Sequence, residues 1–469
     1  MSATQSEFDL VVIGGGSAGY AAARTAADAG LRTAVVEGGR DVGGLCILRG
    51  CMPTKALLYA AEVLHLARQS GTWGVRAGIV DFDWNAVLAR KNRMIADFAD
   101  YRVKQLNDGR FTFIRDHARF ADPHTLELAA GGRLTAKQFV IATGSVVAEP
   151  PLPALTEAGY LTSDDALRLP RPPRSLIVLG GGPVAVELAQ FLARFGTEVT
   201  LVQRSAHILR DFDDDAAAAL EGALRREGMR VFTGTQLLDA GRCAAGKFVE
   251  FAHAGQTVRV EAEDILLALG RSPNTAGLAL ERAGVQTEGR RIVTDAAQRT
   301  SAPHIFAAGD CCGPYEIVHI AIQQGETTVH NALHPDAPRQ MDYRLLTAVV
   351  FTEPQVAVVG LTDKAARARG LPFLAASYPF NDHGKSLIME ALDGFVKLLC
   401  DPVTGEILGG ACAGPLGGEL IHEVVVAMQA RLTVAAFAAT PHYHPTLAEI
   451  WTYPAEELAG QTPSAPARG

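Results

Sequence analysis

The sequence of 469 residues lacks the features of several large classes of protein. It has no apolar run near the roughly 20 residues that a membrane-spanning helix needs. Its seven cysteines are odd in number and scattered, which argues against the disulfide framework of a small secreted domain. A net charge of −8 argues against nucleic acid as a general partner. The first residues lack the basic segment and cleavage site of a signal peptide, so we expect a cytoplasmic protein with neither a membrane nor a nucleic-acid partner.

One pattern occurs twice in the sequence. An apolar strand, a glycine-rich turn, a helix of small residues, a glycine and a second strand begin at Phe8 and again at Arg174, and the two copies align without a gap. This is the βαβ unit that binds dinucleotides. Since a chain of this length should form about three domains, we expect an α/β protein with two Rossmann-like dinucleotide-binding domains and one further domain.

The first copy carries the full set of dinucleotide-binding residues. Gly14, Gly16 and Gly19 occupy the three glycine positions. They allow a tight turn, close approach of a pyrophosphate and close packing of helix on strand, and the helix N-terminus offers free N–H groups to phosphate. Glu37 ends the second strand 23 residues after Gly14, where a carboxylate can bind ribose hydroxyls.

The second copy differs at the acidic position. Gly180 and Gly182 match the first copy, but Gln203 replaces the acid and is followed by Arg204 and later Arg210. Arginines beside a position that lacks the acid suit the 2′-phosphate of NADPH, because they can form charge-assisted hydrogen bonds with it. Arg204 and Arg210 could instead be solvated surface charges. The pattern favours NADPH over NADH.

Two dinucleotide sites in one chain suggest hydride transfer between two dinucleotides, and a nicotinamide and a flavin are the natural pair. Three further apolar strand ends close on a glycine, at 139–145, 265–271 and 305–310. At such glycines the backbone can turn sharply or approach a ligand closely. These strand ends supply the candidate cofactor-binding residues Thr143, Gly144, Gly270, Arg271 and Asp310, the last as a partner for a flavin side-chain hydroxyl.

Several longer motifs follow one another in the order GGGSAG, GGLCILRGCMPTK, GGGPVAVELA, ALGRSPNT, AAGD, FTEPQVAVVG and HPTLAE. From about residue 8 to 460 the chain thus resembles the class I pyridine nucleotide–disulfide oxidoreductases, which include glutathione reductase, dihydrolipoamide dehydrogenase and mercuric reductase. The resemblance implies FAD, a nicotinamide cofactor and a homodimer whose active site is shared between subunits. It predicts the first part of an FAD-binding domain at 1–150, an NAD(P)H-binding domain at 151–273, a return to the FAD-binding or central domain at 274–341, and an α+β dimerisation domain at 342–469.

Cys46 and Cys51 form a close pair within the second motif. An i, i+5 pair on a regular helix points about 140° apart, so bridging needs a loop or a distorted first turn, with a helix beginning near Cys51. Zinc usually needs four ligands and no second pair lies near, so no metal site is predicted. By the resemblance, the two form a redox-active disulfide against the flavin, beside the cofactor-binding Gly44. Cys51 would be the charge-transfer thiolate and Cys46 the thiol that attacks substrate.

The resemblance gives roles to four further residues. Lys55, one turn after Cys51, is expected to pair with Glu187 beside the flavin, although Glu187 could be an ordinary acid on a helix surface. His444 and Glu449 match the family's acid–base dyad, which reaches the disulfide of the other subunit. A histidine can move protons near neutral pH, and a carboxylate can fix its tautomer. Thiol–disulfide interchange needs a deprotonated attacking thiol and a protonated leaving thiol.

Some positions depart from the family's usual pattern. Arg49, between the cysteines, could favour the thiolate or attract an anionic substrate, or simply face solvent. Pro183 stands where many relatives have a bulky side chain over the flavin, so we expect a more open pocket and leakier reaction with oxygen or quinones. Cys311 and Cys312 form a vicinal pair that we expect to be buried and inert.

The leading interpretation is an FAD-dependent oxidoreductase that passes electrons from NADPH through FAD and the Cys46–Cys51 disulfide to a small disulfide-type substrate. An NAD-dependent dihydrolipoamide dehydrogenase is the alternative, because HYHPTLAE is similar to that enzyme's motif. Reduction of a soft metal ion such as Hg(II) is a third hypothesis. The sequence favours it less, because it lacks the C-terminal cysteine pair of mercuric reductases. A non-catalytic, flavin-bound redox sensor is a hypothesis of a different class.

Overall fold

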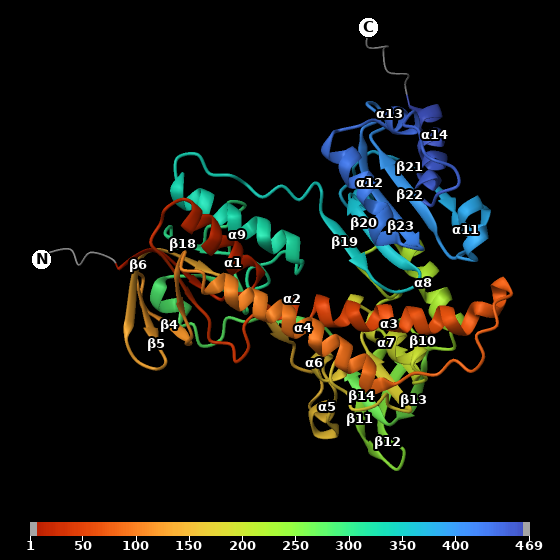
Figure 1. Ribbon diagram of the computed structural model, residues 1–469, viewed down its shortest axis with the longest axis horizontal. Coiled ribbons are helices and arrows are strands. Elements are labelled where there is room, and N and C mark those ends of the chain that lie inside the picture. The colour runs from red at the N-terminus through yellow and green to blue at the C-terminus, as the bar shows by residue number, and fades with distance from the viewer. Residues whose placement is uncertain (1–6, 463–469) are drawn as a thin grey trace, which may run out of the picture. The chain divides into compact units, whose positions relative to one another are not determined.

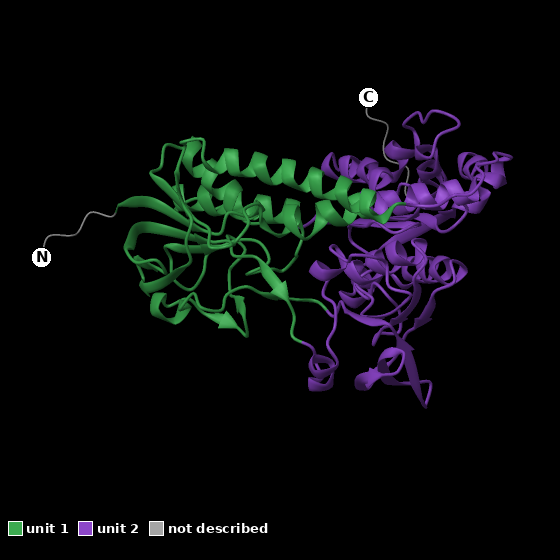
Figure 2. Cartoon of the chain, turned by 60° about the horizontal axis from the view of Figure 1, so that its bottom comes forward, with its two compact units in different colours: residues 1–57, 83–149, 270–342 green, residues 58–82, 150–269, 343–469 purple. Residues whose placement is uncertain are grey.

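The computed structural model describes residues 7–462 of the chain. The prediction that the first residues are not a signal peptide therefore concerns residues that lie partly outside the described range. Two compact units are present, and Figure 2 shows them in different colours. Unit 1 holds residues up to 57, 83–149 and 270–342, and unit 2 holds 58–82, 150–269 and 343 onward. Each unit is therefore assembled from three separate segments of the chain. Among the described residues, no helix combines the length and apolarity of a membrane span.

Unit 1 is built on one sheet in which β1 pairs in parallel with β2 and β6, and β18 pairs in parallel with β6. The predicted return of residues 305–310 to the sheet of the first βαβ unit is thus confirmed. Runs such as Val11–Ile13 are buried on both faces, as strands of a covered parallel sheet are. The elements are β1 (Phe8–Ile13), α1 (Ser17–Asp28), β2 (Thr33–Val36), α2 (Gly44–Leu48), α4 (Trp84–Leu106), β3 (Thr112–Ile114), β4 (Ala118–Asp122), β5 (Thr125–Leu128), β6 (Arg133–Ile141), β7 (Ser145–Val147), β15 (Arg271–Pro273), η2 (Leu280–Ala283), β16 (Thr287–Glu288), β17 (Arg291–Ile292), β18 (Ile305–Ala307) and α9 (Val318–Leu333).

Small residues allow α1 and α9 to pack side by side on this sheet (Figure 1). A Cβ on Gly325 of α9 would lie 2.3 Å from the backbone oxygen of Ala18. The helices therefore approach with backbone nearly against backbone, and any side chain at Gly325 would push them apart. This packing holds the N-terminus of α1 at the edge of the sheet where β1 ends.

Unit 2 repeats the βαβ arrangement and adds an antiparallel layer. Strands β10, β9, β8 and β14 form a parallel sheet, and β11, β12 and β13 form an antiparallel one. The elements of this part are α5 (Pro153–Ala158), α6 (Ser163–Ala166), β8 (Ser175–Leu179), α7 (Pro183–Arg194), β9 (Glu198–Val202), α8 (Asp214–Arg226), β10 (Arg230–Phe232), β11 (Gln236–Cys243), β12 (Gly246–His253), β13 (Gln256–Ala262) and β14 (Asp264–Leu267). The helix α3 (Cys51–Gln69) and the turn η1 (Ser70–Trp73) precede it in the chain.

The C-terminal part of unit 2 is a five-stranded antiparallel sheet in the order β19-β20-β23-β22-β21. Helices α12 and α14 pack against it (Figure 1). The fully buried Trp451 and Phe380 belong to the hydrophobic core between these layers. Strands β22 and β23 pair in antiparallel on either side of residues 401–405. The elements are β19 (Thr347–Val350), β20 (Gln355–Gly360), α10 (Asp363–Ala368), β21 (Leu374–Pro379), η3 (Phe380–Asp382), α11 (Gly384–Met389), β22 (Phe395–Cys400), β23 (Ile407–Gly414), α12 (Gly417–Gln429), α13 (Val434–Ala438), η4 (Ala448–Trp451) and α14 (Thr452–Gln461).

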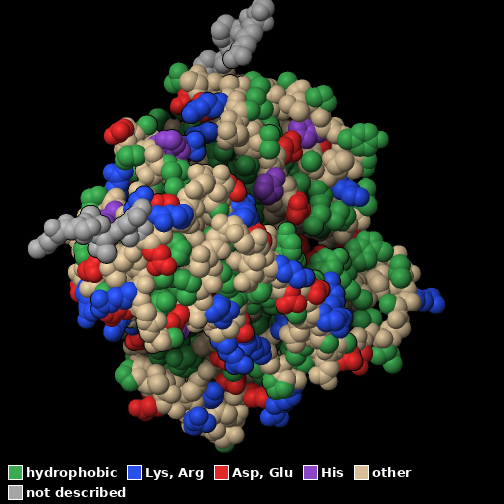
Figure 3. All heavy atoms as spheres, turned by 60° about the vertical axis from the view of Figure 1, so that its left-hand side comes forward, with side chains coloured by type: hydrophobic (Ala, Val, Ile, Leu, Met, Phe, Trp, Pro, Cys, Tyr) green, Lys and Arg blue, Asp and Glu red, His purple; other side chains and the backbone are tan. Residues whose placement is uncertain are grey.

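Acidic and basic side chains are interspersed on the face of the molecule drawn in Figure 3. A mixed pattern of this kind produces no strong field of one sign.

Candidate active site

The two glycine-rich turns are held by the same backbone contacts. Gly14 and Gly180 have φ angles of 106° and 118°, which side chains rarely adopt. A Cβ on Gly14 would lie 2.4 Å from the backbone oxygen of Ala142, just after β6. In the second copy, a Cβ on Gly180 would lie 2.2 Å from that of Ala268, just after β14. In both copies a backbone oxygen just after the parallel neighbour of the first strand, β6 or β14, forces glycine at the turn.

The first turn offers a cradle that fits the pyrophosphate and ribose of FAD. A Cβ on Gly44 would lie 2.7 Å from the Cα of Gly16, so only glycines let the two backbone segments meet there. The Glu37 carboxylate accepts N–H bonds from Gly15 at 2.8 Å and from Gly39 at 2.7 Å. A fixed carboxylate beside a bare backbone turn is what a ribose and its phosphates require. Gly19 completes the set, since its Cβ would lie 1.8 Å from the oxygen of Gly14 and α1 packs directly on β1.

The two cysteines of the second motif lie on either side of a break between helices. Cys46 is in the short helix α2, and Cys51 is the first residue of α3, so the predicted helix start is confirmed. Arg49, the residue just after α2, has φ of −145° and ψ of 9°, which is neither helical nor extended, so the helix stops there. Both cysteines are thiols in this structure, and both are partly exposed.

The electrostatics of Cys46 depend on Cys51 and on two cations. The hydrogen bond with Cys51 and then burial raise the pKa of Cys46, while the charge of Lys55 opposes the rise. Arg102, on α4, interacts electrostatically with Cys46, and its guanidinium stacks 3.9 Å over the ring of Tyr20. Its Nε and one terminal nitrogen are buried and have no hydrogen-bond partner among the described residues. The sequence analysis missed Arg102, because it comes from a helix that carries no motif.

The strand ends of unit 1 meet in a network around Ser145. The Ser145 hydroxyl donates to the Asp310 carboxylate at 2.6 Å and accepts from Nε of Arg271 at 2.7 Å. The backbone oxygens of Thr143 and Gly144 accept from Asn274, at 3.2 and 2.9 Å. The structure thus brings three of the predicted cofactor-binding residues, Thr143, Gly144 and Asp310, together with Arg271. Ser145 and Asn274 were not singled out from the sequence, although both follow the glycine-ending strands.

Thr143 also carries a buried hydroxyl without a hydrogen-bond partner among the described residues. Unpaired buried polar groups are costly in a folded protein and often await a ligand or a water. The neighbouring Gly144 and Gly270 have φ angles of 70° and 122°, which let the backbone turn here. These observations are consistent with a cofactor lying along the strand ends of unit 1.

The second turn presents Gln203 where the first presents Glu37. Gln203 is 9% exposed, and its side chain lies against Gly181, since a Cβ there would be 3.0 Å from it. A Cβ on Gly182 would meet open space, which leaves room for a pyrophosphate. Arg204 and Arg210 are both exposed, and Arg210 contacts Asp211 at 3.4 Å. Their exposure is compatible both with phosphate binding and with solvated surface charges.

Glu187 is buried in α7, with 3% exposure, so the alternative of a helix-surface acid is wrong. Its Oε1 accepts the backbone N–H of Phe351 at 2.9 Å. Lys55 belongs to unit 1 and Glu187 to unit 2. The expected pairing of these two residues therefore stays a prediction.

His444 and Glu449 form a dyad in unit 2. Nδ1 of His444 lies 2.9 Å from Oε2 of Glu449, whose side chain is 12% exposed. The His444 side chain is 78% exposed, so its remaining nitrogen is open to solvent or substrate. This geometry fixes one face of the imidazole and leaves the other free for proton transfer.

The structure shows whether the residues that depart from the family's usual pattern are exposed or buried. Arg49 is exposed, in agreement with the solvent-facing alternative, and its effect on the thiols stays a prediction. Pro183 is the exposed first residue of α7. Cys311 and Cys312 are buried, 0% and 5% exposed, as predicted for inert thiols, and Cys311 donates to the backbone oxygen of Ile141 at 3.3 Å.

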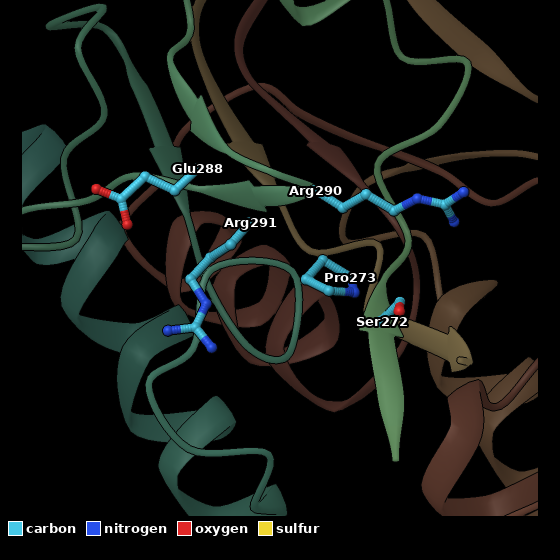
Figure 4. A pocket seen from close by; sticks show the side chains of 5 residues that line it. All are labelled: Ser272, Pro273, Glu288, Arg290 and Arg291. Carbon is cyan, nitrogen blue, oxygen red and sulfur yellow. The ribbon is translucent and has the colours of Figure 1, made fainter. Parts of the chain in front are cut away.

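An open pocket of about 500 Å³ lies in unit 1 beside β15, the strand that carries Arg271 (Figure 4). Figure 4 shows the side chains of Glu288 and Arg290 pointing in opposite directions. The residues that line it differ from the predicted site residues, and Arg290 is engaged with Glu149 at 3.1 Å. We therefore assign the pocket no part in the chemistry.

Comparison with known proteins gives consistent relatives along almost the whole chain. Residues 8–325 match the family described as pyridine nucleotide-disulphide oxidoreductase, and residues 346–455 match the dimerisation domain of that family. A dihydrolipoyl dehydrogenase of Thermus scotoductus is 36% identical over 464 residues, covering 97% of this chain and 98% of that protein. A mercuric reductase of Staphylococcus aureus is 33% identical over 430 residues, covering 91% and 78%. Among solved structures, LpdA from Mycobacterium tuberculosis has a TM-score of 0.85 and 29% sequence identity, and the match covers 96% of this chain and 99% of that one. The HOCl-induced flavoprotein disulfide reductase RclA from Escherichia coli has a TM-score of 0.84 and 27% identity, and the match covers 96% of this chain and 99% of that one.

Two dinucleotide-binding folds and a close pair of thiols define a flavoprotein oxidoreductase that works on sulfur. The chain belongs to the pyridine nucleotide-disulphide oxidoreductase family. FAD and a pyridine nucleotide are the cofactors typical of that family, and the matched dimerisation domain supports a homodimer. The fold class predicted from the sequence is confirmed, while the roles of individual residues and the predicted domain boundaries remain predictions.

Proposed function

We propose that the protein is an NADPH-dependent disulfide reductase that acts through FAD and the Cys46–Cys51 pair. The observation that carries the proposal is the contact between the Cys46 thiol, on α2, and the Cys51 thiol, at the start of α3. FAD bound at the Gly14 turn supplies a two-electron carrier between the nicotinamide and the disulfide. The overall reaction converts NADPH, one proton and a disulfide into NADP⁺ and two thiols.

The raised pKa of Cys46 supports the division of labour between the two cysteines. The hydrogen bond with Cys51 is the largest cause that raises the pKa of Cys46, so in this proposal the proton that the two thiols share favours Cys46. Cys46 must then lose its proton when it attacks the substrate disulfide. A base that approaches from solvent is needed at that moment, and the exposed nitrogen of His444 is suited to the task.

Thiol–disulfide interchange then proceeds in two displacements. The sulfur of Cys46 attacks the substrate disulfide and forms a mixed disulfide, and the released substrate thiolate takes the proton held by His444. The thiolate of Cys51 next attacks the Cys46 sulfur, which re-forms the Cys46–Cys51 disulfide and releases the second half of the substrate as a thiolate. This thiolate takes the one proton of the overall reaction from solvent and becomes the second thiol. In a homodimer, His444 of one subunit would serve the cysteines of the other, as the family resemblance implies.

NADPH is preferred over NADH in this proposal because of the second glycine turn. Gln203 carries no charge to repel a 2′-phosphate, and it lies at the position that Glu37 occupies in the first turn. The exposed Arg204 follows directly, and its guanidinium is available for a phosphate. An acidic residue in place of Gln203 would instead favour the ribose hydroxyls of NADH.

A second candidate function follows from the comparisons. The 36% identity with a dihydrolipoyl dehydrogenase extends over nearly the full length of both chains. Oxidation of a dihydrolipoyl group uses the same thiols in the reverse direction, with NAD⁺ as acceptor. A mercuric ion is a further acceptor to consider, because mercuric reductases are 31–33% identical to the chain.

Anaerobic titration of the purified flavoprotein with NADPH, and in parallel with NADH, tests the proposal. We expect one equivalent of NADPH to give a long-wavelength charge-transfer band while much of the oxidised flavin absorbance remains. Cys51→Ser should abolish the band, and Cys46→Ser should keep a band without any reducing equivalent. Bleaching of the flavin without the band in the wild type would show that the thiols are not coupled to it. A response to NADH alone, together with turnover of lipoamide, would favour the second candidate function.

A further inference from the structure

A second histidine lies behind the His444–Glu449 dyad. His383 stands between η3 and α11, and it is fully buried with 0% exposure. Its Nε2 lies 3.4 Å from Oε1 of Glu449, the carboxylate oxygen that His444 does not hold most closely. Its Nδ1 lies 2.8 Å from the hydroxyl of Ser386, which is also fully buried. The four side chains form one row, Ser386–His383–Glu449–His444, within unit 2.

The chemistry of the row fixes the position of each proton. Nε2 of His383 lies 3.4 Å from the Glu449 carboxylate, without the alignment of a hydrogen bond, and the charge of that carboxylate favours a proton on Nε2. Burial lowers the pKa of His383, so the ring is neutral and Nδ1 has a lone pair. The Ser386 hydroxyl donates to that lone pair. At the other end, Nδ1–H of His444 donates to Glu449, which leaves the lone pair on the exposed Nε2 of His444.

We propose that His383 is a positioning residue for the acid–base dyad, holding the Glu449 carboxylate in the orientation that aligns His444. The inference rests on the proposed function, in which His444 transfers protons during thiol–disulfide interchange. Nδ1 of His444 lies within 3.2 Å of both Glu449 oxygens, and a second imidazole nitrogen beside Oε1 restrains rotation of the carboxylate. The imidazole that the carboxylate binds is therefore held as well. The Ser386 hydroxyl in turn gives Nδ1 of His383 a hydrogen-bond partner.

Few other charged groups near His383 could hold the Glu449 carboxylate in its place. Phe380 and Tyr453 face the ring edge-on, at centroid distances of 6.5 and 6.4 Å. The Tyr453 ring stacks on Tyr378, whose hydroxyl donates to Asp382 at 3.0 Å. Glu449 and His444 are the ionisable groups that act on His383 electrostatically.

A third histidine, His442, lies two residues before His444 in the same loop. It is occupied elsewhere, with Nδ1 on the backbone oxygen of Thr440 at 2.8 Å and Nε2 on Glu423. Both of its nitrogens therefore have acceptors of their own. It is not a substitute for His383 as a donor to Glu449.

Two substitutions at one position separate the positioning role from a merely structural one. The amide nitrogen of His383→Gln reaches about the place of Nε2 and can still donate to Glu449, whereas that of His383→Asn reaches only the place of Nδ1. Steady-state kinetics of the holoenzyme with NADPH and 5,5′-dithiobis(2-nitrobenzoic acid), from pH 5.5 to 9, are measured for both. We expect His383→Asn to lower kcat about tenfold and to move the pH limb of His444 by about 0.5 unit or more, with an unchanged KM for NADPH. His383→Gln should restore most of kcat and the wild-type limb.

Controls separate failure of this inference from failure of the proposed function. Anaerobic reduction of both variants by NADPH should proceed at the wild-type rate, because that half-reaction does not need the dyad. If His444→Gln lowers turnover strongly but the pH limb of His383→Asn matches the wild type, His383 does not position the dyad. Equal losses in His383→Asn and His383→Gln would also overturn the inference. If His444→Gln itself leaves disulfide turnover unchanged, the proposed acid–base role fails first.

Discussion

Gly180 and Gly182 lie in the same turn but are constrained in different ways. Gly180 has positive φ and no room for a side chain, whereas Gly182 has φ of −77° and open space beside it. We expect Gly180→Ala to cost more than about 2 kcal/mol of stability. Gly182→Ala should leave the free energy of unfolding within about 0.5 kcal/mol of the wild type and still weaken NADPH binding, because its methyl group occupies the place of the pyrophosphate.

Thermal unfolding combined with NADPH titration distinguishes the two effects. Equal losses of Tm in the two variants would contradict the role given to the backbone oxygen of Ala268. An unchanged affinity in Gly182→Ala would place the nucleotide elsewhere.

The choice of nucleotide is a second property of single residues. In the double variant Gln203→Glu, Arg204→Ala, a carboxylate replaces the amide and the nearest guanidinium is removed. We expect the ratio of kcat/KM for NADPH to that for NADH to fall at least about tenfold, since charge-assisted contacts to a phosphate are worth about 1.5–3 kcal/mol. Arg259→Ala, which removes an exposed arginine of the antiparallel layer, is the control and should leave the ratio unchanged. A ratio that is the same in all three proteins would contradict the NADPH assignment.

The cations near Cys46 give a third prediction at this scale. Removing a positive charge destabilises the thiolate, so Arg102→Met should raise the pH at which Cys46 of the reduced enzyme is alkylated by iodoacetamide, by roughly 0.5 unit. Arg49→Met, which removes an exposed arginine two residues before Cys51, should change the profile less. Site-resolved alkylation measured by mass spectrometry over a pH series checks both. A larger change of the alkylation profile in Arg49→Met than in Arg102→Met would mean that Arg49, and not Arg102, stabilises the Cys46 thiolate.

At the scale of elements, the loop between β19 and β20 carries an unusual carboxylate. Burial raises the pKa of Glu353 to about 8, with Glu62 and Glu227 adding to the rise and Arg194 opposing it. The side chain of Gln190 binds the Glu353 backbone on both sides, at 2.7 Å to its N–H and 2.7 Å to its oxygen, so the loop is fixed on α7.

The sign of the resulting pH dependence follows from the proton count. In an unfolded chain a glutamate has a pKa of about 4.3, so between that value and about 8 the folded state binds one more proton. Stability should therefore fall as pH rises through this interval. Glu353→Gln should flatten the dependence and raise the stability at pH 9 by at least about 1.4 kcal/mol, the value of one pKa unit. Tm of the wild type and of Glu353→Gln is measured from pH 5 to 9. Parallel curves of Tm against pH for the two proteins would refute the prediction.

At the scale of the whole molecule, the shared active site of a homodimer is testable by mixing subunits. Cys46→Ser and His444→Gln should each be nearly inactive alone. A mixed dimer has one site with both lesions and one with neither, if the histidine and the cysteines come from different subunits. Co-refolding equal amounts should then recover about a quarter of the wild-type activity. No recovery, with mixed dimers shown by native mass spectrometry, would place the whole site in one subunit.

The sequence by itself determined the two dinucleotide folds and the identity of the thiol motif. Both depend on residues close together in the chain: the spacing of Gly14, Gly16 and Gly19, or the helix start at Cys51. Local spacing fixes the backbone path through a turn or helix, so such features can be recognised without a structure. The same reasoning failed to decide whether Glu187 was buried, because burial depends on which elements pack over a helix.

Only the tertiary structure decided which distant side chains act on these motifs. Arg102 reaches Cys46 from α4, Ser145 joins Asp310 to Arg271, and His383 meets Glu449 from 66 positions earlier in the chain. None of these partners stands at a fixed spacing from the residue it contacts. Hydrogen bonds and charge interactions depend on distances of a few ångströms and on the exclusion of water. These quantities are set when the sheets and helices pack, and no local pattern of residues contains them.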